Sequence, residues 1–240
     1  MAGTIYVALS GMRTRMAQLD RVAADIANQG TAGYKGERAG TVAVNRPSFD
    51  ALLEAAVDTV AGPTTIDFRP GVILPTGRDL DVALDGKGFF VVQTPNGPRY
   101  TRNGGFTRSA DGTLITNDGM PVLGQNGPMK IGDGPLTLRP DGTVAVDRAA
   151  VGKLQVVDFP EYSALAREEG GRFRAPGGVT PAATSGTFVR NGALEQSNVS
   201  VSQRMANLME VSRSFEALQR GVSLMSTDID ARAITELGRR

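Results

Sequence analysis

The sequence predicts an α+β protein in which long N- and C-terminal helices pair as a coiled-coil-like module, with an all-β core domain inserted between them. Three observations predict this fold class. Apolar residues recur in steps of three and four near both chain ends, which is the spacing of a coiled-coil seam. Between the ends, short β-forming segments alternate with Asp-Gly and Asn-Gly turns. The 240 residues suffice for one large or two modest domains that each bury a core.

The expected domain division is discontinuous along the chain. Residues 1–35 and 197–240 form the helical assembly module, and residues 36–196 form the β-rich core domain. Because the helical segments flank the β-rich block, both chain ends must come together to build the first module.

Residues 4–29 are predicted to form one helix with a narrow apolar stripe. Its polar face carries Arg21 and Asp25, among others. The helix ends near Asn28 and Gly30, which readily adopt left-handed conformations. A stripe this narrow is typical of a seam between helices rather than of a helix lying on a globular core. The apolar positions are Ile5, Leu9, Met12, Met16, Leu19, Ala23 and Ile26.

The middle of the chain is predicted to form short strands joined by tight turns. The turn dipeptides lie at 85–86, 96–97, 103–104, 111–112, 118–119, 126–127, 133–134, 141–142 and 191–192. Candidate strands are 81–84, 89–93, 113–116, 136–138, 143–146, 153–158 and 187–189, and one short helix is expected at 49–60. Asp111-Gly112-Thr113-Leu114 and Asp141-Gly142-Thr143-Val144 look like two copies of one turn that leads into a strand.

The last helix is predicted to start after Ser200, which with Gln203 fits a capping box, and to run to about residue 237. At this length it must protrude or pair lengthwise, since it is much longer than an average globular helix. Its apolar stripe consists of Val201, Met205, Leu208, Val211, Phe215, Leu218, Val222, Met225 and Ile229. We expect the stripes of both helices to form an assembly interface. The alternative is that they are ordinary core helices packed against the β domain.

Composition removes several classes of function. The formal net charge is +1, so no global field recruits nucleic acid or an anionic membrane. The absence of His and Cys removes the commonest general base, the thiol nucleophile and every disulfide. No apolar run approaches a membrane span, and the start of the chain lacks the features of a cleaved signal peptide. We therefore expect neither nucleic-acid binding nor direct membrane insertion.

No motif in the chain points to a catalytic, cofactor-binding or metal-binding site. The Asp-Gly turns do not supply the alternating ligands and closing Glu of an EF-hand loop. Gly86-Lys87-Gly88 lacks the Gly-Lys-Ser/Thr ending of a phosphate loop. We expect no catalytic residue, no metal and no cofactor. A carboxylate- or calcium-dependent hydrolase in the β domain is kept as the remote alternative.

Several segments resemble the bacterial flagellar rod and hook proteins. They run in order across nearly the whole chain: Ile5–Met12, Ile26–Asn28, Thr31–Lys35, Leu80–Val92, Tyr100–Phe106, Asp111–Leu114, Pro121–Gly124 and Gly192–Val199. Within this family, the sequence is most similar to the proximal-rod subunits. One departure is visible, since Ala24-Asp25 stands where the family usually has two asparagines.

The resemblance implies a structural subunit of the proximal rod of the flagellar basal body. It implies partners that are further copies of the chain and other proximal and distal rod subunits, with the membrane ring and the export apparatus as further contacts. It also implies export to the periplasm, unfolded, by the flagellar type III system without a cleaved signal peptide, and terminal helices that pair antiparallel along the axial tube and fold on assembly. The alternative within the family is a distal-rod or hook-type subunit.

Overall fold

The computed structural model describes residues 2–39, 64–132, 134, 136–147, 149–177, 179–184 and 186–237. The helix expected at 49–60 lies outside these residues. The chain divides into two compact units. Unit 1 comprises Met1–Ala27, Glu37–Thr65 and Ser200–Arg240, and unit 2 comprises Asn28–Gly36 and Ile66–Val199.

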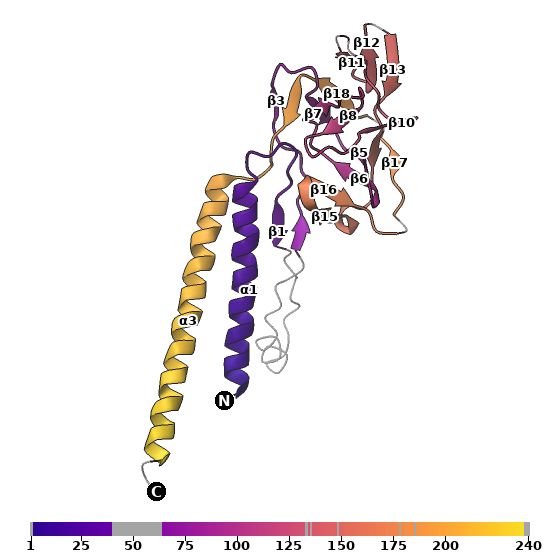
Figure 1. Cartoon of the computed structure of the whole chain (residues 1–240). Coiled ribbons are helices and arrows are strands. Elements are labelled where there is room, and N and C mark those ends of the chain that lie inside the picture. Colours follow the sequence, from indigo (N-terminus) through magenta and orange to yellow (C-terminus); the bar gives the residue numbers. More distant parts are fainter. Residues whose placement is uncertain are drawn as a thin grey trace. The chain divides into compact units, whose positions relative to one another are not determined.

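Unit 1 is built on the two long helices, α1 (Ala2–Ala27) and α3 (Val201–Leu237). Both helices expected from the sequence are therefore confirmed as helices, within a few residues at each end. Figure 1 shows them side by side, together with the short strand β1 (Glu37–Ala39), which pairs with β2 (Thr64–Ile66).

Two contacts show that α1 and α3 run antiparallel. Asp25, near the end of α1, forms an ion pair with Arg204, near the start of α3. Gly11, in the first half of α1, faces Leu218, whose Cδ1 would lie 3.6 Å from a Cβ on Gly11. Later positions on one helix thus meet earlier positions on the other.

The predicted fold class was wrong in its helical part, because the two helices are not paired as a coiled coil. A coiled coil encloses its seam residues as knobs in holes. Here Leu9 and Met16 of the α1 stripe, and Met205 of the α3 stripe, are exposed. Among the α1 side chains that the structure describes, the buried ones are instead Val22 and Asp25. In the part of the chain that the structure describes, α1 and α3 are the only α-helices, and a large β-rich body makes up most of the remainder.

Unit 2 is organised around a six-stranded antiparallel sheet, which Figure 1 shows in magenta and orange. Its order is β15 (Ala166–Glu168), β16 (Arg172–Arg174), β6 (Gly97–Thr101), β5 (Phe89–Thr94), β14 (Val156–Asp158) and β17 (Ala182–Ala183). A three-stranded sheet contains β11 (Leu136–Leu138), β12 (Thr143–Val146) and β13 (Ala149–Lys153).

Four two-stranded antiparallel pairs and two 3₁₀ turns complete unit 2. The pairs are β4 (Val82–Asp85) with β18 (Phe188–Asn191), β3 (Ile73–Pro75) with β19 (Ala193–Glu195), β7 (Phe106–Arg108) with β8 (Leu114–Thr116), and β9 (Leu123–Gly124) with β10 (Gly127–Pro128). The turns are η1 (Tyr162–Ala164) and η2 (Glu169–Gly171).

Strand β5 separates two hydrophobic clusters. Successive side chains of a strand point to opposite faces of its sheet. Phe90 and Val92 accordingly join a cluster that includes Phe106, whereas Phe89 and Val91 join a cluster rich in aromatic rings. Because both faces are covered, the first four residues of β5 are all buried and show no polar alternation.

Most of the expected strands are present, with shifts at their ends. The segments 136–138 and 143–146 match β11 and β12 residue for residue. The segment 153–158 was expected to be one strand, but it is split between the end of β13 and β14. The break coincides with Leu154 and Gln155, because Leu154 forms an isolated bridge with Gly124 and the Gln155 N–H donates to Leu123 O at 3.0 Å.

The two copies of the Asp-Gly-Thr turn have the same geometry. In the first, the Thr113 N–H and hydroxyl donate to the carboxylate of Asp111 at 3.2 and 2.9 Å. In the second, Thr143 does the same to Asp141 at 3.0 and 2.8 Å. These hydrogen bonds lower the pKa of both carboxyl groups. The repeat expected from the sequence is therefore confirmed as a structural repeat.

Candidate assembly surface

The face of α1 that lines the groove between the helices lies one position before the predicted stripe. A shallow groove of about 240 Å³ runs between α1 and α3. The α1 residues that line it are Arg15, Gln18, Val22 and Asp25, with Arg21 beside them. These positions also follow steps of three and four, but most of the side chains are polar. The α3 side is lined by Arg204, Asn207, Glu210, Val211 and Ser214.

An ion-pair network closes one end of this groove. Asp25 is 2% exposed, and its Oδ2 lies 2.9 Å from the Arg204 guanidinium. The same Oδ2 accepts a hydrogen bond from the Glu37 N–H at 3.3 Å, and Arg204 also donates to Glu37 O. Arg21 lies 4.0 Å from the Glu37 carboxylate. The network therefore ties α1, α3 and β1 together within unit 1.

The predicted interface residues fall into three groups in the structure. Leu9, Met16, Ala23 and Met205 are exposed. For Ile5, Met225 and Ile229 the side chains lie outside the part that the structure describes. The remainder are half-buried, namely Met12, Leu19, Ile26, Val201, Leu208, Val211, Phe215, Leu218 and Val222. The structure thus brings only part of each stripe toward the other helix.

Each long helix carries exposed apolar side chains on the face that points away from the groove. Leu9 and Met16 on α1 are 45% and 56% exposed, and Met205 and Met209 on α3 are 49% and 61% exposed. Since an α-helix turns by about 100° per residue, each pair projects roughly opposite to the groove-lining residues of its own helix. The groove-lining faces point toward the other helix, so Leu9 and Met16 face away from α3, and Met205 and Met209 face away from α1. We name these four residues, two on the outward face of each helix, the helical back face.

Three residues of unit 1 that shape these surfaces were missed at the sequence level. Asp25 was assigned to the polar face, Val22 was left out of the stripe, and Met209 was not in the α3 list. A second stripe with the same spacing, passing through Val22 and Asp25, was present in the sequence. A search for apolar residues alone does not find this second stripe, because the stripe contains arginine, glutamine and aspartate.

Within the described residues, no group of three or more acidic side chains is arranged to hold a metal ion. Among those same residues, none of the helices combines the length and apolarity needed to cross a membrane. The helices of unit 1 carry exposed apolar side chains on their outward faces and charged side chains along the groove between them.

Comparison with known proteins identifies relatives along the whole chain. Residues 83–151 match the family model described as "Flagellar hook protein FlgE/F/G D1 domain", and residues 190–231 match the model "Flagellar basal body rod FlgEFG protein C-terminal". The chain is 31% identical to the flagellar basal-body rod protein FlgF of Caulobacter vibrioides, covering 100% of this chain and 99% of that protein.

Two further relatives also match over most of this chain and most of their own length. The chain is 33% identical to FlgF of Salmonella typhimurium, over 90% of this chain and 91% of that protein. It is 30% identical to the flagellar basal-body rod protein FlgG of Bacillus subtilis, over 90% and 92%.

Proposed function

Because this chain belongs to the flagellar basal-body rod protein family and is a structural subunit of the basal-body rod, we propose that it takes the FlgF-type, proximal position in that rod. It is not an enzyme, in keeping with relatives that are named as rod proteins. Similarity to FlgF proteins over almost the full chain is the observation that carries the proposal. We also propose that the chain divides as predicted into a helical assembly module, 1–35 plus 197–240, and a core domain, 36–196.

We propose that the helical back face contacts neighbouring subunits. Leu9, Met16, Met205 and Met209 are each about half exposed, although burying a large apolar side chain fully is worth about 1.5–3 kcal/mol. The two exposed apolar side chains of each helix share one face, and such grouped side chains mark an interaction site more often than scattered ones do. The half-buried residues of the predicted stripes, with Leu218 and Phe215 among them, belong to the same proposed assembly interface.

The expected binding partners follow from the location of this protein in the basal body. Membership of the family supports assembly with other flagellar rod and basal-body proteins. We propose more specifically that the neighbours are further copies of this chain and the adjoining proximal and distal rod subunits, with the membrane ring and the export apparatus as additional contacts. Export by the flagellar type III system into the periplasm belongs to the same proposal.

A pair of matched variants tests the assembly surface. Met16→Asp places a charge on the helical back face, whereas Ala17→Asp places the same charge at the next exposed position of α1, outside that face. Met16→Asp is expected to be expressed and folded but absent from purified basal bodies, with motility lost. Ala17→Asp is expected to support motility. Normal incorporation of Met16→Asp would refute the assignment of this face.

The position in the rod needs a separate measurement. Site-specific cross-linking within purified basal bodies, from a photoreactive residue at position 209, should capture a subunit on the membrane-ring side of the rod. Cross-links only to distal-rod or hook subunits would replace the proximal assignment with the distal alternative, while leaving the assembly surface intact.

A further inference from the structure

Two buried cations in unit 2 share one buried carboxylate. The side chains of Lys35 and Glu195 are both 0% exposed, and that of Arg102 is 5% exposed. Lys35 Nζ donates to Glu195 Oε1, and Arg102 donates to Glu195 Oε2 at 3.2 Å. One carboxylate thus serves each cation with a different oxygen.

The three residues come from distant parts of the sequence. Lys35 lies in the segment Asn28–Gly36, which follows α1, and Glu195 ends β19, shortly before α3. Arg102 follows β6, between these two in the chain. The Gly33 N–H donates to Glu195 O at 2.7 Å, so the backbones of the two end segments are also joined directly.

A third segment, around Arg69, is joined to the same carboxylate. The Gly71 N–H donates to Glu195 Oε1 at 2.9 Å, and Lys35 Nζ donates to Arg69 O at 2.9 Å. Asn198 adds a parallel connection, since its side chain donates to Arg69 O at 3.0 Å and accepts from the Gly36 N–H at 2.8 Å. The two end segments are therefore docked against one another in a single register.

The electrostatic balance of this cluster depends on Glu195. Removing one partner of a buried ion pair leaves an uncompensated charge, which is far more costly than never having made the pair. Burial lowers the pKa of Lys35, and the Glu195 carboxylate opposes that shift. Without Glu195, Arg102 would keep hydrogen bonds to two carbonyls, Gly86 O at 2.7 Å and Leu84 O at 3.4 Å, and its contact with the Phe89 ring, none of which carries a negative charge. Those two carbonyls belong to β4 and to the turn after it, in the core of unit 2.

We infer that Glu195 locks unit 2, so that its β core reaches full stability only when the segment after α1 and the segment before α3 are both docked. Folding of the core is thereby conditional on the two ends of the unit, although the core strands lie between them in sequence. A chain that lacks the segment before α3, or docks it out of register, leaves Lys35 and Arg102 without their anion, and a chain that lacks the segment after α1 loses Lys35 and its bonds to Glu195 and Arg69.

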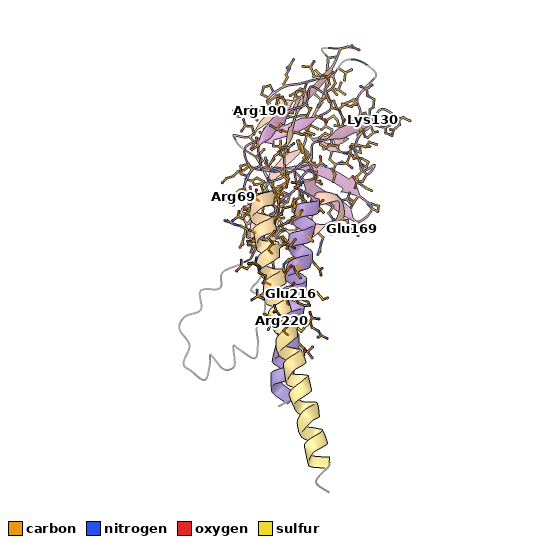
Figure 2. All side chains as sticks on the ribbon, turned by 90° about the vertical axis from the view of Figure 1, so that its left-hand side faces the viewer. Arg69, Lys130, Glu169, Arg190, Glu216 and Arg220 are labelled. Carbon is orange, nitrogen blue, oxygen red and sulfur yellow. The ribbon has the colours of Figure 1, made fainter. Side chains whose placement is uncertain are left out.

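Hydrogen exchange on the full-length chain tests this lock. Glu195→Gln keeps the shape of the side chain and removes its charge. We expect amide exchange to accelerate by roughly 100-fold or more throughout β4, β5 and β6, since their opening becomes part of one destabilised unit. The control is Asp85→Asn, which removes a carboxylate from an exposed ion pair with Arg190 and should change exchange in β5 and β6 by less than about tenfold. Figure 2 labels Arg190 on unit 2.

A double variant distinguishes the lock from general damage to the core. Lys35→Met combined with Glu195→Gln removes one cation together with the anion, which restores the net charge of the cluster. Its exchange in β4 to β6 is expected to be at least about tenfold slower than that of Glu195→Gln alone. The inference is overturned if the double variant is no better protected or folded than the single one. It is also overturned if Glu195→Gln accelerates exchange only at Gly33 and Gly71.

Discussion

Asp25 and Arg204 form a nearly buried ion pair between α1 and α3, with 2.9 Å between the carboxylate and the guanidinium. Their side chains are 2% and 20% exposed. The pair sets the antiparallel register of the helices, since a shift by one helical turn would move the two groups apart by about 5.4 Å.

Asp25→Asn should therefore destabilise unit 1. Asparagine keeps the size of the side chain but leaves the Arg204 guanidinium without its anion. We expect the free energy of unfolding of the helices to fall by about 3 kcal/mol, the lower end of the range for a broken buried pair. Denaturant unfolding followed by circular dichroism at 222 nm measures it.

The control for this variant is an exposed ion pair on the same helix. Glu216 and Arg220 project from α3 one turn apart, 3.9 Å between charged groups, and are 63% and 76% exposed (Figure 2). Glu216→Gln should cost less than about 0.5 kcal/mol. Equal losses for the two variants would show that burial of Asp25 adds nothing.

Tyr162 should make unit 2 sensitive to alkaline pH. Its hydroxyl donates to Asp158 Oδ1 at 2.5 Å, and burial followed by this interaction raises its pKa from 10.0 to about 12. Below pH 10 the phenol is protonated in the folded and the unfolded states, so its stabilising contribution is complete. Between about pH 10 and 12 the unfolded state ionises first, and the free energy of unfolding falls. Because the ring is only half-buried, we expect a loss of about 1 kcal/mol.

Tyr162→Phe supplies the comparison. This variant should lose about 1 kcal/mol at pH 7, where the hydrogen bond to Asp158 is missing, and should then show a smaller alkaline fall than the wild type. Tyr100, whose pKa is also raised by burial, contributes to the fall that remains. Absorbance at 295 nm reports phenolate formation directly, and ionisation of Tyr162 near pH 10 would contradict the expectation.

Gly104 should tolerate no side chain at all. A Cβ at this position would lie 1.7 Å from Val82 O and 3.2 Å from Phe90 Cε2, both in the core of unit 2. Gly104→Ala must therefore displace backbone, and we expect a loss of about 3 kcal/mol or more. Gly177→Ala is the matched control, because nothing lies within 4 Å of its Cβ, and it should change stability by less than about 0.5 kcal/mol. Similar melting curves for the two variants would refute the close approach.

The elements that the sequence predicts well are those with strong local signals. The apolar period and the Gly30 region define α1, and the Asp-Gly-Thr signature defines the turns before Leu114 and Val144. The fold-class prediction failed at the helix contact, because two stripes with the same spacing run along α1. The more apolar one, through Met16, was preferred, whereas the other, through Val22 and Asp25, faces the groove.

The buried ionic cluster could not have been predicted in the same way. Lys35, Arg102 and Glu195 lie within family motifs, but charged residues in a loop or at a strand end are usually solvated. Only the three-dimensional approach of their segments makes one carboxylate the partner of both cations. The short strands β3 and β19 were also missed, because their pairing depends on the same approach rather than on alternation within three residues.

Three of the four side chains of the helical back face are methionines. Methionine is unbranched, turns about three side-chain bonds and has a polarizable sulfur, so it fills differently shaped spaces at small cost. A surface made of leucine or isoleucine would fit one neighbour in one geometry. Identical subunits can use the same methionine surface to contact neighbours of different shape above, below and beside them. A surface of branched side chains does not adapt in this way.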